Sequence, residues 1–129
     1  MARRKSIEIS GFRHQNPIPN ASLVGNLLMS GSILGFDAGT RNLPPTIEGQ
    51  VANMFAHMRE IVQAAGGSLD DIVKVTVWLK DPSDRAALNA AWVELFPDPH
   101  SRPARHTQRL EPDSPALVSC EIAALIGQG

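Results

Sequence analysis

The stretch that decides the fold is Thr46-Ile-Glu-Gly-Gln-Val-Ala-Asn-Met-Phe-Ala-His-Met-Arg-Glu-Ile-Val-Gln-Ala-Ala-Gly66. Its apolar side chains recur with the 3.6-residue period of a helix and form a single stripe: Ile47, Val51, Met54, Phe55, Met58, Ile61, Val62 and Ala65. Thr46 is a suitable N-cap, and Gly66 or Gly67 a suitable stop. Because such a stripe must be buried, this helix is predicted to cover a sheet. Gln50 and His57 lie on one edge of the stripe and are predicted to be solvated or at an interface.

The residues after this helix predict a capped turn, a strand and a second helix. Ser68 and Asp71 have capping-box spacing. The run 72–80 is predicted as a strand with one face made of Val73, Val75, Val77 and Leu79. Asp81 is predicted to cap a second helix with Pro82 at its first position. Its buried stripe is predicted to be Leu88, Ala91, Trp92 and Leu95, with Asn89 outside it.

Both ends of the chain are predicted to be extended. Alternation predicts a short strand over 6–10, and Gly25-Asn26 predicts a hairpin between 22–24 and 27–30. Two further runs, 105–110 and 116–126, close the chain. The order strands, helix, strand, helix, strands predicts an α+β fold with two helices on one face of a sheet.

One sheet face is then left uncovered within a subunit. We assign to it the apolar face of the last run, which consists of Val118, Cys120, Ile122 and Ala124. An exposed apolar face of this kind is typical of a surface that is buried against another protein or another copy of the chain. The sequence therefore predicts an oligomer.

Length, charge and composition narrow the class of protein. The 129 residues fit one domain spanning 1–129, and the net charge of −1 argues against nucleic-acid binding by bulk basic charge. One cysteine allows no intrachain disulfide, and neither a secretory signal nor a membrane-spanning run is visible. We therefore expect a cytoplasmic enzyme or binding protein. The four histidines lack metal-ligand spacing, so no metal or cofactor is expected.

Two charged residues are candidates for a catalytic or binding role. Pro103 stiffens the backbone of Ser101-Arg-Pro-Ala-Arg-His-Thr107, and Arg105 offers the planar fork that matches a carboxylate. Glu121 lies in an otherwise apolar run, where a carboxylate is costly to bury without a partner or a role. If their strands are neighbours, the two lie near one another. The alternative is that Arg105 is a solvated surface charge and that Glu121 faces water on the polar side of its strand.

An ordered set of motifs spans nearly the whole chain: Gly25-Asn-Leu-Leu-Met-Ser-Gly31, Gln50, Ala64-Ala-Gly-Gly-Ser-Leu-Asp-Asp-Ile-Val-Lys-Val-Thr-Val-Trp-Leu-Lys-Asp81, Asn89, Arg102-Pro-Ala-Arg105 and Glu121. In this order the motifs resemble the Rid family of reactive-intermediate (imine) deaminases, also called YjgF-like proteins. The resemblance implies a chorismate-mutase-like (YjgF-type) fold, assembled as a homotrimer with three clefts between subunits.

The resemblance also implies site residues. The family arginine that matches Arg105 holds the substrate carboxylate, and the glutamate that matches Glu121 positions or activates water. The Ser30-Gly31 region lines the cleft, and Asn89 matches a recurrent family asparagine. The implied reaction hydrolyses a 2-imino or enamine acid to a 2-keto acid and ammonia, without metal or organic cofactor.

The sequence departs from the Rid family pattern at two positions that concern the wall of the cleft. The family tyrosine of the N-terminal loop is missing from the run 16–20, and Thr107 stands where relatives often have a cysteine. Phe12, His14 and Phe36 are candidates to complete the wall, and Arg105 is expected to face a neighbouring subunit's loop at 14–20 or its Phe36.

Two alternatives to an imine deaminase remain. One is a non-catalytic trimer that binds small carboxylates, which needs Arg105 but not Glu121. The other is a catabolic deaminase of a larger unsaturated amino acid, as in the aminomuconate deaminases that resemble this family.

Overall fold

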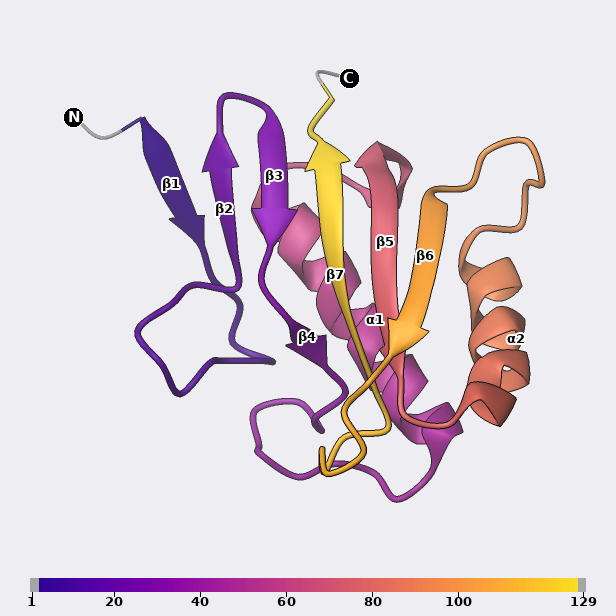
Figure 1. The fold of residues 1–129 in the computed structure, drawn as a ribbon. Helices are drawn as coiled ribbons and strands as arrows, with labels where there is room; N and C mark the ends of the chain where they lie inside the picture. Colours follow the sequence, from indigo (N-terminus) through magenta and orange to yellow (C-terminus); the bar gives the residue numbers. More distant parts are fainter. Residues whose placement is uncertain (1–2, 128–129) are drawn as a thin grey trace.

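The computed structural model describes residues 3–127, so residues 1–2 and 128–129 of the expected domain lie outside the described part. Strands lie at both ends of the chain and between the helices (Figure 1). The strands are β1 (Arg4–Ile7), β2 (Ala21–Val24), β3 (Leu27–Ser30), β4 (Ile33–Leu34), β5 (Ile72–Leu79), β6 (Ala104–Arg109) and β7 (Val118–Leu125). The helices are α1 (Ile47–Ala64) and α2 (Arg85–Leu95), with short 3₁₀ turns η1 (Leu69–Asp71) and η2 (Pro82–Asp84).

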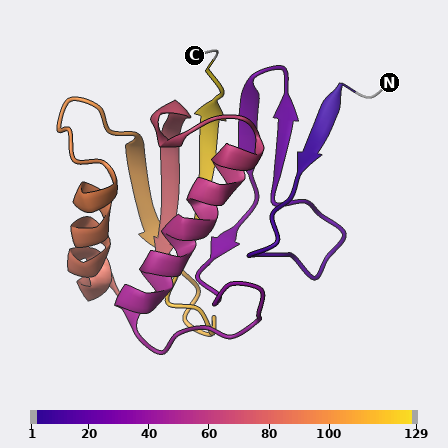
Figure 2. The ribbon, with the colours of Figure 1, turned by 180° about the vertical axis from the view of Figure 1, so that it is seen from behind.

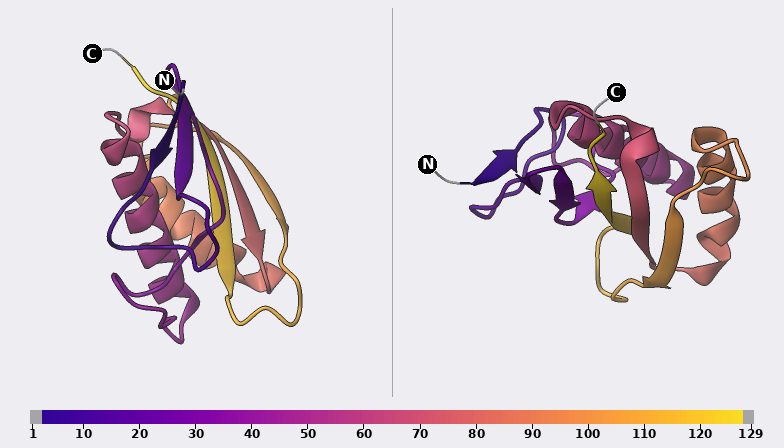
Figure 3. Two further views of the ribbon diagram at one scale, coloured as in Figure 1. Left: turned by 90° about the vertical axis from the view of Figure 1, so that its left-hand side faces the viewer. Right: turned by 90° about the horizontal axis from the view of Figure 1, so that it is seen from above.

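The strands form one mixed sheet in the order β1-β2-β3-β7-β5-β6, with β4 also paired to β7. β5 and β6 run parallel because α2 connects them as a crossover, and the other pairs are antiparallel. Figure 2 shows α1 and α2 in front of the sheet, and the edge-on view of Figure 3 shows both on the same side of it. The predicted α+β architecture, a mixed sheet with two helices on one face, is confirmed.

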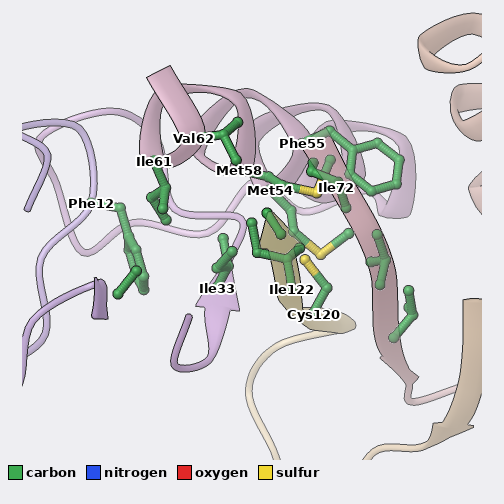
Figure 4. Close-up of a cluster of buried hydrophobic side chains, with 14 of the residues drawn as sticks. Phe12, Ile33, Met54, Phe55, Met58, Ile61, Val62, Ile72, Cys120 and Ile122 are labelled. Atoms are coloured by element: carbon green, nitrogen blue, oxygen red, sulfur yellow. The ribbon is translucent and has the colours of Figure 1, made fainter. Parts of the chain in front are cut away.

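Helix α1 begins and ends where its sequence predicts. The Thr46 hydroxyl accepts a hydrogen bond from the Gly49 amide at 3.1 Å, so it caps the first turn. Gly66 has a φ of 90°, a left-handed conformation that glycine adopts without strain, and it ends the helix. The stripe residues from Val51 to Val62 are buried against the sheet (Figure 4).

Gln50 and His57 are corrections to the prediction, because both are buried. Gln50 donates to the Pro44 carbonyl at 2.8 Å and accepts from the Leu117 amide at 2.9 Å. His57 Nε2 lies 2.8 Å from the Phe36 carbonyl oxygen. Loop main chain that folds over α1 supplies these partners, and burial of polar side chains is tolerated when they are hydrogen-bonded.

The uncovered sheet face was assigned to the wrong side of the last strand. Val118, Cys120, Ile122 and Ala124 are all buried beneath the helices, and Figure 4 shows Cys120 and Ile122 directed toward α1. The face that no helix covers instead carries the alternate residues of β7 and its neighbour β3. Its exposed large apolar side chains include Leu27, Met29 and Leu125.

Strand details also differ from the prediction. β1 covers 4–7 rather than 6–10, because the Ile9 amide donates to the Asn20 side chain instead of to a strand. In β5 the register with β7 shifts between Ile72 and Lys74, so Val73 is 59% exposed while Val75, Val77 and Leu79 are buried. The predicted hairpin at Gly25-Asn26 is confirmed, with Val24 opposite Leu27. Asp81 and Pro82 open η2, after which α2 starts at Arg85.

Candidate active site

Arg105 faces the helices and is held by α2. It is level with Val75 of β5, whose side chain is buried under the helices. Its Nη2 donates to Asn89 Oδ1 at 2.7 Å, and its Cζ lies 5.0 Å from the centre of the Trp92 ring. Asn89 and Trp92 are three residues apart, so they share one side of α2. The helix therefore fixes the guanidinium with a hydrogen bond on one side and an aromatic face on another.

Within residues 3–127, Arg105 bonds to the neutral side chain of Asn89 and not to a carboxylate. Burial and, to a smaller extent, the positive charge of Arg85 lower the pKa of Arg105. An arginine nevertheless remains charged at neutral pH. Its Nη1 is buried and has no hydrogen-bond partner among residues 3–127. A partly desolvated guanidinium with a free donor is suited to bind a carboxylate.

Glu121 faces the other way. It is level with Thr76 of β5, while its neighbours Cys120 and Ile122 are directed toward the helices. Its side chain is exposed at a hollow of about 390 Å³ on the uncovered face. The hollow is lined by Ser32, Trp78, Arg109, Leu110, Glu111, Ser119 and Glu121. A carboxylate that borders an open hollow can act as a general base on a water molecule that enters it.

The strands of Arg105 and Glu121 are not neighbours, so the condition for their proximity within one chain is not met. β5 lies between β6 and β7 in the sheet, and the two side chains lie on opposite faces of it. Thr107 is level with Val77 and so lies on the same face as Arg105. A single copy of the chain therefore presents the two candidate residues on opposite faces of the sheet.

Ser30 and Gly31 are tied into the scaffold beside Glu121. The Ser30 hydroxyl accepts from the Ile122 amide at 2.9 Å and donates to the Gly31 carbonyl at 2.8 Å. The Gly31 amide donates to the Asn20 carbonyl at 2.9 Å. The polar groups that were expected to line the cleft are thus used in bonds within the chain.

Phe36, a candidate for the cleft wall, is buried in the core of the single chain. The Phe36 ring stacks on Phe12 with 6.0 Å between the ring centroids. Arg41 also contacts the Phe36 ring, with its Cζ 4.5 Å from the ring centroid. Phe12 is likewise buried. In a single copy of the chain both rings are therefore part of the core.

His14 occupies a different position, next to the hollow of the N-terminal loop. This hollow has a volume of about 290 Å³ and is lined by Ser6, Glu8, Arg13, His14 and residues 16–20. The imidazole contacts Phe12 edge-on at 4.9 Å, and its Nε2 is directed toward Gly31 without a hydrogen-bond partner among residues 3–127. Burial, and secondarily the charge of Arg41, lower the pKa of His14.

Sequence patterns missed the contribution of Trp92 to the Arg105 environment. Trp92 was assigned only to the buried stripe of α2, and Asn89 only to a position outside it. The available signal was their three-residue spacing next to a strand that carries an arginine. Among residues 3–127, no group of three or more histidine, cysteine, aspartate or glutamate side chains is arranged to hold a metal ion. No helix within this part of the chain is long and apolar enough to cross a membrane.

Comparison with known proteins assigns this combination of sheet, helices and charged residues to a family. RidA from the Antarctic bacterium Psychrobacter sp. has the same fold, with a TM-score of 0.86 and 32% identity over 95% of this chain and 99% of that one. The family model described as endoribonuclease L-PSP matches residues 15–126. The chain therefore belongs to the endoribonuclease L-PSP family, and the resemblance to Rid proteins is confirmed.

Curated relatives carry two kinds of name. A RutC family protein of Pyrococcus horikoshii is 36% identical over 112 residues, which cover 84% of this chain and 86% of the relative. A 2-iminobutanoate/2-iminopropanoate deaminase of Escherichia coli is 31% identical over 106 residues, covering 79% of this chain and 80% of the relative. The family thus includes imine deaminases as well as proteins whose names state no reaction.

Proposed function

We propose that this protein hydrolyses 2-imino or enamine acids to 2-keto acids and ammonia, in sites shared between the copies of a homotrimer. The observation that carries the proposal is the environment of Arg105, a partly buried guanidinium whose buried Nη1 has no hydrogen-bond partner among residues 3–127. A 2-imino acid is an anion whose carboxylate can accept hydrogen bonds from the Arg105 guanidinium. The deaminase name of the Escherichia coli relative supports the reaction class.

In the proposed mechanism Arg105 binds the substrate carboxylate and fixes the imine carbon. A water molecule about 3 Å from that carbon attacks it, and Glu121 accepts a proton from the water. A C–O bond forms and the C=N π bond breaks, so the nitrogen takes up a proton. Glu121 then returns its proton to the nitrogen of the resulting carbinolamine. The C–N bond breaks as the hydroxyl releases its proton to solvent, which yields ammonia and the 2-keto acid. An enamine substrate is first protonated on carbon to give the imine.

The sharing of sites follows from the opposite orientation of Arg105 and Glu121, each of which forms one half-site. Substrate can contact both Arg105 and Glu121 only if a second copy brings its β6 edge, which carries Arg105, against the uncovered sheet face of the first. That uncovered face carries exposed Leu27, Met29 and Leu125, which favour burial by a partner. Three-fold symmetry is inferred from the family resemblance, and a closed ring uses every half-site.

The test is ammonia release from freshly generated 2-iminopropanoate and 2-iminobutanoate, measured against the spontaneous rate. We expect acceleration by the parent protein and by Arg59→Ala, which removes an exposed arginine of α1 that is assigned no role in the proposed site. Arg105→Ala and Glu121→Gln are expected to abolish it. If no imine is consumed faster than spontaneously while calorimetry detects pyruvate binding that needs Arg105, the protein is a carboxylate-binding protein instead.

A further inference from the structure

The strand that carries Glu121 faces an irregularity in its neighbours. β3 pairs with β7 as far as Met29 opposite Ala123, and β4 resumes the ladder with Ile33 opposite Cys120. Residues 30, 31 and 32 therefore face only residues 121 and 122. This is a β-bulge, a feature that bends a strand and re-aims its side chains, often next to active sites.

The hydroxyl of Ser30 closes this bulge. The Ile122 amide, in a buried residue that directly follows Glu121, has the Ser30 hydroxyl as its acceptor at 2.9 Å. The hydroxyl proton is directed to the Gly31 carbonyl at 2.8 Å. Ser30 thus takes the place of the main-chain carbonyl that a regular ladder would offer, and its single donor is already used.

The other side of the bulge is anchored by Asn20, which is buried. Its carbonyl accepts from the Gly31 amide at 2.9 Å. Its side chain donates to the Phe12 carbonyl at 2.8 Å and accepts from the Ile9 amide at 3.0 Å. The bulge is therefore fixed from both flanks, by the N-terminal segment through Asn20 and by β7 through Ser30.

We propose that Ser30 is a positioning residue, whose hydroxyl fixes the main chain of β7 beside Glu121 and so sets the direction of the Glu121 carboxylate, without contact to the substrate. This inference rests on the proposed role of Glu121 as the base. It replaces the expectation that Ser30 lines the cleft as a binding group. Loss of the hydroxyl leaves the Ile122 amide without its acceptor and frees the main chain on one side of Glu121.

The experiment compares Ser30→Ala, Ser30→Thr and the parent in two measurements. The first is hydrogen exchange of the Ile122 amide, observed by NMR. The second is steady-state ammonia release from 2-iminopropanoate. For Ser30→Ala we expect Ile122 exchange at least about tenfold faster, kcat lowered about tenfold, and KM within about twofold of the parent. Ser30→Thr retains a hydroxyl and is expected to restore both properties.

Ser83→Ala is the control, since it removes an exposed hydroxyl from η2, outside the bulge, the uncovered face and the environment of Arg105. It is expected to behave as the parent in both measurements. A rise in KM with unchanged kcat for Ser30→Ala would mean that Ser30 binds substrate, and unchanged Ile122 exchange would mean that it does not hold β7; either result overturns the proposal. A parent without deaminase activity would refute the proposed function, whereas the exchange measurement would still decide the role of Ser30 in holding β7.

Discussion

Arg105 and Glu121 project from opposite faces of one sheet, separated by strand β5. Arg105 is level with buried Val75 and contacts α2, whereas Glu121 is level with Thr76 and borders the hollow on the uncovered face. A change of rotamer cannot move a side chain through a packed sheet. A reaction that uses both residues therefore needs two copies of the chain, and this requirement can be tested directly.

Two inactive variants are expected to restore each other's activity when their subunits are mixed. A site that takes Arg105 from one copy and Glu121 from its neighbour is intact when an Arg105→Ala subunit lies next to a Glu121→Gln subunit in the correct order. Random trimers from equal amounts should contain about a quarter of intact sites. The measurement is ammonia release after joint unfolding and refolding of the two variants.

The control for this mixing experiment is Arg105→Ala refolded together with an Arg105→Ala, Glu121→Gln double variant. This mixture contains no intact arginine and should stay inactive. Persistent inactivity of the mixture of single variants, with mixed oligomers confirmed by mass spectrometry, would contradict a shared site.

Arg105→Lys is expected to be almost as damaging as Arg105→Ala. A lysine keeps the charge but loses the planar fork and the geometry that bonds Asn89 while facing Trp92. The loss should be about 2 kcal/mol of transition-state stabilisation, or roughly 30-fold in kcat/KM. The control is Arg59→Lys. If Arg105→Lys keeps kcat/KM within about twofold of the parent, Arg105 does not bind the carboxylate through its fork.

Local patterns predicted the helices well and the strand faces less well. The stripe of α1 and its Thr46 cap depend on residues close in sequence, so the sequence contains the full information. The face of β7 with Cys120 and Ile122 was correctly predicted to be buried, but its cover is α1 rather than another subunit. Apolar alternation shows that a face is buried and does not show what covers it.

The candidate site could be predicted only in part, because sequence patterns select residues but do not show how the fold arranges them. Arg105 and Glu121 could be selected from residue type and family resemblance, but their mutual orientation depends on the insertion of β5 between two strands that follow it in the chain. Val73 is exposed because a register shift reverses the alternation of β5, and a shift of one residue moves side chains to the other face. Phe36 could not be assigned to the core until the fold placed Phe12 and Arg41 against it.

Leu125→Asp is expected to weaken the proposed trimer without unfolding the subunit. Leu125 is 51% exposed opposite Leu27 on the uncovered face, so the subunit alone tolerates a charge there, but an apolar interface does not. Burial of an unpaired charge costs at least several kcal/mol. Light scattering should report a smaller mass than for the parent, with unchanged far-UV circular dichroism.

Two further substitutions make the assembly experiment specific. Ala56→Asp, at an exposed residue of α1, should leave the mass unchanged. Ile122→Asp places a charge under α1 and should unfold the chain. If Leu125→Asp keeps the mass of the parent, the uncovered face is not the interface.

Cys120 is expected to be unreactive in the folded protein. Burial, with a further contribution from the charge of Glu121, raises the pKa of the Cys120 thiol far above neutrality. The thiolate is the reactive form, so iodoacetamide should modify the native protein at least about tenfold more slowly than the unfolded protein. Ser101→Cys in a Cys120→Ala background provides an exposed thiol as the control. Rapid modification of native Cys120 would show that β7 opens. It would also make Cys120 a candidate for the role of the cysteine that Thr107 replaces.

His14 is expected to make the protein less stable in mildly acidic solution. In the unfolded chain His14 titrates near its ordinary pKa of about 6.5, whereas burial and Arg41 lower its pKa in the folded protein. Between the two pKa values the unfolded state binds more protons than the folded state, so the free energy of unfolding increases with pH and falls as the solution is acidified.

Urea unfolding from about pH 7.5 to about pH 5.5 should show this loss of stability, and His14→Phe, which keeps a ring against Phe12, should reduce the loss. His100→Asn, at an exposed loop position, is the control and should keep the slope of the parent. If His14→Phe loses stability on acidification as steeply as the parent, the neutral imidazole beside Gly31 is not the source of the pH dependence.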